Sequence, residues 1–425
     1  MEEEFMSLNA TPTSERVHIG IFGKRNAGKS SLINALTGQE LAIVSDVSGT
    51  TTDPVSKAME LLPLGPVVLI DTPGIDDEGE LGALRVKKSY QVLNKMDLAI
   101  LVCNAQEGIS REDALLLERI QSKRIPWILV MNKTDLLQEK EGGRQERICR
   151  ELGLSAEEAH ILWVSARSGE QIYELKEEIA KRASAEKQER PLVSDLLEAG
   201  DSAVLVVPID KAAPKGRLIL PQQQTIRDAL EAGASVMVTR DTELGDTLKM
   251  LNKPPKIVIT DSQVFGRVAR ETPEEVLLTS FSILFARYKG ELSAQVEGAR
   301  KLDSIKDGDH ILVCEGCTHH RQCDDIGTVK LPAWIRKYTK SEPVFTFTSG
   351  GGFPDDLTPY QLIVHCGGCM LNEREIKYRI ACAKDAGIPI TNYGVAIAYM
   401  NGILKRSVEA FPDIAKMLED AQGNR

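Results

Sequence analysis

Residues 23–30 read GKRNAGKS, and this segment restricts the possible folds more than any other part of the sequence. It matches the pattern G-x-x-x-x-G-K-[ST], follows the apolar stretch VHIGIF and precedes the helix-like stretch SLINAL. A strand before the pattern and a helix after it are the context in which it forms a phosphate-binding loop. The backbone N–H groups of such a loop surround the β-phosphate, its lysine adds positive charge, and its hydroxyl binds Mg²⁺. The residues expected to contact the phosphates and Mg²⁺ are Gly23, Asn26, Ala27, Gly28, Lys29, Ser30 and Ser31.

Three further short motifs follow predicted strands in the order expected of a guanine-nucleotide site. DTPG at 71–74 places Asp71 near the metal and the Gly74 backbone N–H near the γ-phosphate. NKTD at 132–135 places the Asp135 carboxylate where it can accept hydrogen bonds from guanine N1–H and the exocyclic amine. Adenine lacks this pair of donors, so the carboxylate rejects ATP. With SAR at 165–167 facing guanine O6, the predicted base-binding residues are Asn132, Lys133, Asp135, Ser165 and Ala166.

Five short apolar runs alternate with amphipathic stretches over the first 182 residues. The runs lie at 17–22, 67–70, 98–102, 127–131 and 161–164. Buried parallel strands have this continuous apolar character, and their alternation with helices indicates a doubly wound α/β sheet. A P-loop GTPase domain is therefore predicted at 1–182, followed by a polar linker at 183–194.

The segment around the second motif indicates the GTPase subtype. The polar stretch VSGTTTDP at 47–54 is expected to carry the switch threonine, and Ile75 stands where Ras-like proteins have a water-orienting glutamine. The domain here resembles the MnmE and Era GTPases. That resemblance implies Mg²⁺ binding by Thr51, a K⁺ held with the help of Asn26, and slow hydrolysis. The water-positioning glutamate of that family is replaced here by Asp77. Lys29, Asn26, Thr51, Gly74 and Asp77 are the catalytic candidates.

Two smaller α/β domains are predicted after the linker. Strand-like runs at 203–209, 235–239, 256–260 and 276–279 carry no phosphate loop or catalytic pair, so 195–275 is interpreted as a structural or subunit-contact domain. The domain at 276–425 begins with a long helical pattern over 280–302. It continues with three strands, two of which run directly into cysteines. In open α/β sheets, ligands bind at the carboxyl ends of the strands.

Six of the eight cysteines lie between 314 and 382, and four of the six histidines lie between 310 and 365. CTH at 317–319 and HCGGC at 365–369 can bring three thiolates to one metal if the fold joins the two strand ends. On spacing alone, zinc and an iron–sulfur cluster are both compatible with these ligands. Cys314 forms its own C-x-x-C pair with Cys317 and is an alternative ligand, whereas Cys323 and Cys382 are interpreted as incidental thiols.

The GTPase motifs, the middle α/β segment and CTHH…HCGGC together resemble the HydF family of [FeFe]-hydrogenase maturation GTPases over essentially the whole chain. The resemblance implies a [4Fe–4S] cluster on Cys317, Cys366 and Cys369, with His319 and His365 as candidates for a fourth ligand. It also implies a homodimer formed through the middle domain. The expected role is a scaffold or carrier that receives a diiron subcluster precursor made with radical-SAM maturases and delivers it to apo [FeFe]-hydrogenase.

Charge and composition bear on the alternatives. A net charge of -10 argues against a nucleic-acid or anionic-membrane surface, which needs basic residues. The acidic start, and the lack of an apolar run long enough to span a bilayer, favour a cytoplasmic protein. Two other hypotheses remain open: an RNA-acting GTPase with a zinc module, and a GTPase that switches partners around a structural zinc domain.

Overall fold

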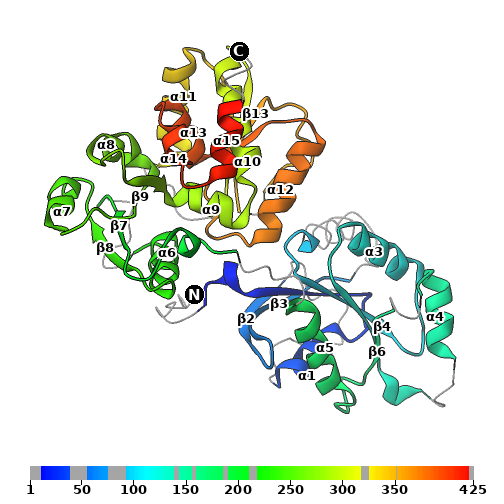
Figure 1. The fold of residues 1–425 in the computed structure, drawn as a ribbon. Helices are drawn as coiled ribbons and strands as arrows, with labels where there is room; N and C mark the ends of the chain where they lie inside the picture. Colours follow the sequence, from blue (N-terminus) through cyan, green and yellow to red (C-terminus); the bar gives the residue numbers. More distant parts are fainter. Residues whose placement is uncertain are drawn as a thin grey trace. The chain divides into compact units, whose positions relative to one another are not determined.

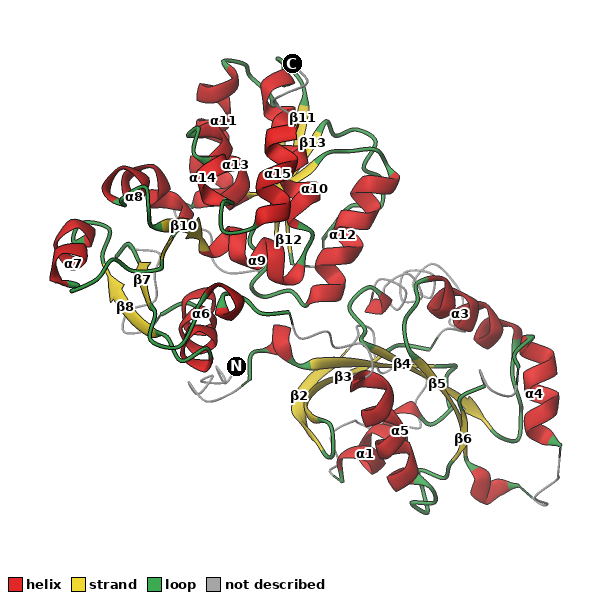
Figure 2. Ribbon diagram, in the orientation of Figure 1, coloured by secondary structure: helices red, strands yellow, loops and turns green. Residues whose placement is uncertain are grey.

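The computed structural model describes residues 11–38, 55–74, 92–137, 143–155, 159–184, 190–209, 218–316, 325–350 and 352–420. The chain divides into two compact units, Met1–Gln188 and Glu189–Arg425. Figure 1 traces the fold of both units, and Figure 2 distinguishes their helices from their strands.

The first unit contains a six-stranded sheet of order β2-β3-β1-β4-β5-β6. Its strands are β1 (Val17–Phe22), β2 (Val55–Leu61), β3 (Gly65–Asp71), β4 (Leu98–Asn104), β5 (Trp127–Asn132) and β6 (Ile161–Trp163). All neighbouring pairs are parallel except β2 with β3, which is antiparallel. The predicted α/β fold with a doubly wound sheet is confirmed, and β2 is an addition at the edge that the apolar runs did not indicate.

Helices cover both faces of this sheet. The helices are α1 (Lys29–Thr37), α3 (Arg111–Ser122), α4 (Arg144–Leu152) and α5 (Ile172–Ser184). Helices α1 and α5 bury Leu32, Leu36, Leu175 and Ile179 in one apolar core, which includes inward residues of β1, β3, β4 and β5. Helices α3 and α4 bury leucine and isoleucine side chains in a separate core on the other face. The carboxyl ends of the strands therefore lie between the two helical layers, where ligands bind in open sheets.

The second unit begins with a four-stranded parallel sheet of order β10-β9-β7-β8. Its strands are β7 (Ser202–Val206), β8 (Ser235–Thr239), β9 (Ile257–Thr260) and β10 (Leu277–Ser280). Helices α6 (Leu220–Glu231), α7 (Leu244–Met250) and α8 (Phe265–Glu271) connect them. Because β10 pairs with β9, this sheet extends to Ser280, beyond the domain boundary predicted at 275.

A second parallel sheet of order β12-β11-β13-β14 completes this unit. It consists of β11 (His310–Glu315), β12 (Val344–Ser349), β13 (Leu362–His365) and β14 (Ile390–Asn392). The surrounding helices are α9 (Phe281–Lys289), α10 (Leu292–Ala299), α11 (Leu331–Thr339), α12 (Glu373–Asp385), α13 (Tyr393–Met400), α14 (Leu404–Ser407) and α15 (Pro412–Asp420). The long helix predicted over 280–302 is wrong. A break at Gly290 separates α9 from α10, and a Cβ at Gly290 would lie 2.8 Å from the Ala286 carbonyl oxygen.

Among the described helices, none combines the length and the apolar character that crossing a membrane requires.

Candidate functional site

The phosphate-binding loop joins β1 to α1 with a backbone that depends on glycine. Gly23 and Gly28 adopt φ values of 142° and 92°, which L-residues with side chains rarely adopt. A Cβ at Gly23 would lie 2.2 Å from the Val102 carbonyl oxygen, and a Cβ at Gly28 would lie 2.3 Å from the Asn132 amide nitrogen. The Lys29 ammonium donates to the Gly23 and Lys24 carbonyls at 2.9 and 2.8 Å. The loop is thus shaped for backbone N–H groups, a lysine charge and the start of a helix to converge on an anion.

Ser30 and Asp71, two of the predicted metal-binding residues, meet at the loop's carboxyl side. The Ser30 hydroxyl donates to an Asp71 carboxylate oxygen at 3.1 Å. The other Asp71 oxygen is buried and has no hydrogen-bond partner among the described residues. Burial raises the pKa of Asp71, and the Lys29 charge and the Ser30 hydrogen bond oppose that rise. A hydroxyl beside a carboxylate with one unsatisfied oxygen suits a hard cation such as Mg²⁺.

One side chain links the phosphate loop to the predicted base-binding loops. The Asn132 amide donates to the Ala27 carbonyl at 3.1 Å, and its oxygen accepts from the Ala166 N–H at 3.0 Å. The Ser165 hydroxyl donates to the Asp135 carboxylate at 2.6 Å. NKTD and SAR, which follow adjacent strands β5 and β6, are therefore held together next to the P-loop. Lys133, within NKTD, adopts a left-handed φ of 68°.

The structure brings most of the predicted nucleotide residues together at this edge, including Gly74, which lies three residues after the end of β3. Thr51, Ile75 and Asp77 lie outside the described residues, so the switch threonine, the glutamine position and the water-positioning aspartate stay predictions. Ser31 lies in the first turn of α1.

The two strands that run into cysteines are neighbours in the second sheet of the C-terminal unit. In the β11–β13 pair, Cys314 lies opposite His365, and the Cys366 N–H donates to the Cys314 carbonyl at 2.8 Å. Gly316, the residue before Cys317, donates its N–H to the Cys366 sulfur at 3.1 Å. The end of β11 therefore lies beside Cys366. Cys317, His319, His320 and Cys323 themselves lie outside the described residues.

Cys366 has the environment of a thiolate ligand. Its sulfur accepts N–H groups from Gly316 at 3.1 Å and from Gly368 at 3.4 Å. Gly368 has a φ of 66°, and a Cβ there would lie 2.5 Å from an Ile376 side-chain carbon. The glycines of HCGGC therefore let the backbone fold around the sulfur. Hydrogen bonds to the sulfur of this kind tune clusters that thiolates hold.

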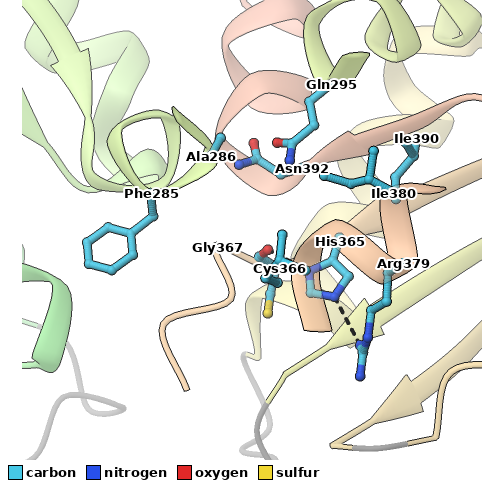
Figure 3. Close-up of a pocket in the computed structure, with 11 residues that line it drawn as sticks. Phe285, Ala286, Gln295, His365, Cys366, Gly367, Arg379, Ile380, Ile390 and Asn392 are labelled. Atoms are coloured by element: carbon cyan, nitrogen blue, oxygen red, sulfur yellow. Dashed lines mark hydrogen bonds between the residues drawn. The ribbon is translucent and has the colours of Figure 1, made fainter. Parts of the chain in front are cut away.

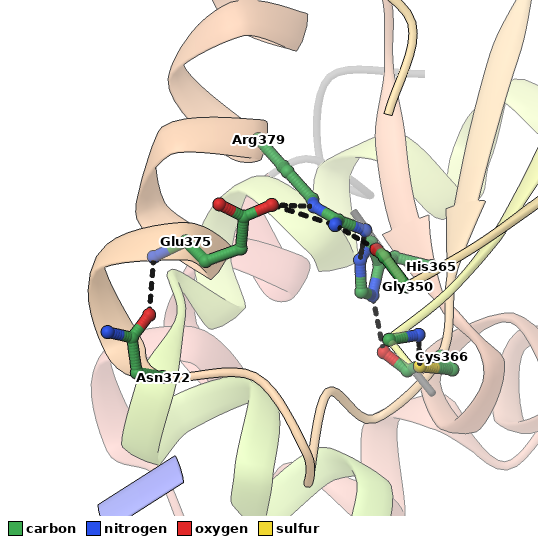
Figure 4. A network of polar contacts seen from close by, with 7 residues as sticks. Gly350, His365, Cys366, Asn372, Glu375 and Arg379 are labelled. Atoms are coloured by element: carbon green, nitrogen blue, oxygen red, sulfur yellow. Dashed lines mark hydrogen bonds and ion pairs between the residues drawn. The ribbon is translucent and has the colours of Figure 1, made fainter. Parts of the chain in front are cut away.

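His365 is fixed between the cysteine loop and a buried arginine (Figures 3 and 4). Its Nδ1 lies 2.8 Å from the Cys366 carbonyl oxygen, and its Nε2 lies 3.0 Å from Arg379 Nη1. A carbonyl only accepts and a guanidinium only donates, so Nδ1 carries the proton and Nε2 accepts. Burial, together with the Arg379 charge, lowers the pKa of His365 to about 3. Both ring nitrogens are occupied, and a ligand role for His365 would require the guanidinium to leave Nε2.

Arg379 is itself held by a satisfied network, drawn in Figure 4. It is 1% exposed and donates from Nε and Nη2 to one Glu375 oxygen at 2.9 and 2.7 Å. It also donates to the Gly350 carbonyl at 2.6 Å. This network was not among the sequence predictions, although the spacing of four residues between Glu375 and Arg379 on one helix is a signal for an ion pair.

The other thiols of the region differ in surroundings. Cys314 is fully buried within β11, and burial raises its pKa to about 11. Its side chain packs in an apolar core with Leu312 and Ile363, whereas Cys366 packs beside a different core that includes Val313 and Tyr393. Cys382 is half-buried on α12, and His310 is exposed at the start of β11. Burial also raises the pKa of the Cys369 thiol, and the Lys289 charge opposes that rise.

Three models of known protein families match parts of the two units. The model of the hydrogen maturase F dimerization domain matches residues 192–290, and that of its tetramerization domain matches 293–410. The chain belongs to the hydrogen maturase F family. Residues 18–133 match the model described as 50S ribosome-binding GTPase, so the N-terminal unit of this family member is a GTPase domain that binds GTP and GDP with Mg²⁺.

Two curated GTPases each match less than half of this chain. GTPase Der of Wolinella succinogenes is 36% identical over 183 residues, which are 42% of this chain and 38% of that protein. The tRNA modification GTPase MnmE of Laribacter hongkongensis is 34% identical over 157 residues, or 36% of this chain and 32% of that protein. The chain thus spans about a third of the length of these relatives. A crystal structure of Aquifex aeolicus Era bound to GDP and aluminium fluoride is 20% identical, covers 52% of this chain and 92% of that chain, and has a TM-score of 0.37.

Proposed function

We propose that this chain is a GTP-hydrolysing iron–sulfur scaffold that carries the diiron subcluster precursor to apo [FeFe]-hydrogenase. The observation that carries the proposal is the convergence of the two cysteine-bearing strand ends, in which Gly316 and Gly368 both donate to the Cys366 sulfur. This arrangement supports a cluster site in a chain that also holds a GTPase domain and two domains of a hydrogen maturase.

Three thiolates are proposed to hold a [4Fe–4S] cluster, namely those of Cys317, Cys366 and Cys369. Thiolate is the ligand that these clusters need, and the bound cluster would supply an iron with an exchangeable position at which a cargo could bind. The chain's own contribution is to orient the sulfurs. Backbone N–H groups direct the Cys366 sulfur, and His365 fixes the Cys366 carbonyl. His319 stays a candidate for the fourth ligand, whereas His365 acts as a hydrogen-bond bridge in this proposal.

A transfer assay tests this function. Protein co-expressed with the radical-SAM maturases is incubated with apo [FeFe]-hydrogenase, and hydrogen evolution is measured. Activation by the loaded protein, and none by the same protein without maturases, is the expected result. A zinc-containing protein that activates no hydrogenase would favour the alternative, a partner-switching GTPase with a structural zinc module.

Hydrolysis is expected to be slow and several-fold faster in K⁺ than in Na⁺. Asn26 is exposed on the phosphate loop with a φ of 59°, and it is proposed to help hold a K⁺ beside the phosphates, where positive charge stabilises the transition state. Phosphate release should be measured in the two salts at constant ionic strength. Asn26→Ala should abolish the difference, and equal wild-type rates in both salts would contradict the K⁺ site.

The dimer is proposed to form through β8, an edge strand of the 192–290 domain. Val238 is 43% exposed on this strand, and an apolar edge strand is a template for pairing with another chain. Val238→Lys should shift the protein towards monomer in light scattering at tens of micromolar. The matched control is Val344→Lys on the edge strand β12, where the side chain is 45% exposed. A Val238→Lys protein as dimeric as the control would rule out β8 as the interface.

A further inference from the structure

Lys289 places a charged side chain in the interior of the C-terminal unit. It is the last residue of α9 and is 2% exposed. Its ammonium donates to the Leu371 carbonyl at 3.1 Å and approaches the Cys369 carbonyl at 3.4 Å. It also lies 5.6 Å from the centroid of the Phe285 ring. Burial of an ammonium is costly unless polar groups compensate it, so these contacts have to be maintained for the charge to stay buried.

These contacts connect two regions of the chain that belong to different family domains. Lys289 lies in the part that matches the dimerization domain, whereas Cys369 and Leu371 lie in the part that matches the tetramerization domain. The two carbonyls flank Met370, at the end of the HCGGC segment. His365 fixes the first half of this segment through the Cys366 carbonyl, and Lys289 fixes the second half.

The Lys289 charge lies in the protein interior beside the cysteine segment. The Lys289 ammonium approaches the cysteine segment through carbonyl dipoles and an aromatic face. Away from water, where the effective dielectric is low, a unit charge acts more strongly on a neighbouring group than it does at the surface.

We propose that Lys289 is a positioning residue of the cysteine segment, and that its buried positive charge raises the reduction potential of a cluster held there. The inference rests on the proposed cluster. Reduction adds one electron to the cluster, and a nearby positive charge stabilises the reduced form more than the oxidised one. Nearby charge and hydrogen bonding are among the features by which a protein sets such potentials.

Three substitutions test this role in the full-length, cluster-loaded protein. Lys289→Met removes the buried charge, whereas Lys289→Arg keeps it. Lys384→Met is the control, because it removes a charge from a lysine side chain that is 49% exposed and pairs with Glu291. An EPR-monitored redox titration should give Lys289→Met a reduction equilibrium constant at least about tenfold lower than wild type, which is about 59 mV for a one-electron couple. Lys289→Arg and Lys384→Met should stay near the wild-type potential.

The outcomes separate this inference from the proposed function. Wild-type protein without iron and sulfide would contradict the cluster itself. Equal potentials for wild type and Lys289→Met, or an equal shift for Lys384→Met, would overturn the role of Lys289. If Lys289→Met does not bind a cluster, hydrogen exchange of the metal-free variant and of metal-free wild type tests the positioning role instead. Faster exchange confined to the amides around 366–371 supports the positioning role, and unchanged exchange there contradicts it.

Discussion

Replacing Cys366 by serine is expected to abolish cluster binding while GTP hydrolysis stays near the wild-type rate. A serine hydroxyl is a harder ligand that stays protonated, so the two N–H groups aimed at residue 366 would lose their thiolate partner. The GTPase domain lies in the other compact unit and has its own apolar cores. Iron and sulfide per chain, measured after anaerobic reconstitution, and phosphate release from GTP are the two readouts. Cys317→Ser and Cys369→Ser should behave in the same way.

Cys382→Ser is the matched control, because Cys382 is half-buried on α12 in the same unit. It should retain the iron, the sulfide and the EPR signal. Cys314 tests the alternative ligand assignment. It is buried inside β11, but it forms a C-x-x-C pair with Cys317 in the sequence. A Cys314→Ser protein that loses the cluster, together with a Cys317→Ser protein that keeps it, would show that the ligand assignment is wrong.

Asp135→Asn is expected to weaken GTP binding by at least about 100-fold, because two charge-assisted hydrogen bonds of about 1.5–3 kcal/mol each would be lost. Xanthosine triphosphate carries a carbonyl in place of the exocyclic amine, so an asparagine amide can pair with it. The variant should therefore prefer the xanthine nucleotide. Affinities for both nucleotides, measured by titration with fluorescent analogues, check this exchange of specificity.

Glu170→Gln is the control for this change. Glu170 accepts a hydrogen bond from the Thr134 hydroxyl at 3.0 Å beside the same loop, but it is not assigned to the base. Its substitution should leave the preference for GTP unchanged. Equal turnover of ATP and GTP by the wild-type protein would contradict the role assigned to Asp135.

Strands β1 and β4 could be predicted from the sequence because both of their faces are buried and their residues are almost all apolar. The predicted runs 17–22 and 235–239 coincide with β1 and β8, and the run at 98–102 lies within β4. The proximity of motifs that follow neighbouring strands could also be predicted, because the carboxyl ends of parallel strands lie at the same edge of the sheet. NKTD lies beside SAR at neighbouring strand ends, as expected from their order. Convergence of the two cysteine-bearing strand ends was only a condition of the predicted metal site, and HCGGC does lie beside the end of β11.

Other features could not be predicted because their signals are weak or non-local. The antiparallel edge strand β2 is largely exposed and contains no apolar run, and β14 has only three residues. The helical pattern over 280–302 continues on both sides of Gly290, although the helix is broken there. The contacts of Lys289 with Leu371 and of Arg379 with Gly350 join residues far apart in the chain, so no local period indicates them.

The most direct test of the central claim is metal and sulfide analysis of the anaerobically purified wild-type protein, combined with EPR after reduction. The account predicts a brown protein with about four iron and four sulfide per chain and the EPR signal of a reduced [4Fe–4S] cluster. It also predicts that Cys366→Ser, purified in parallel, lacks the brown colour, the iron, the sulfide and the EPR signal. A colourless protein with about one zinc per chain and no sulfide would contradict it.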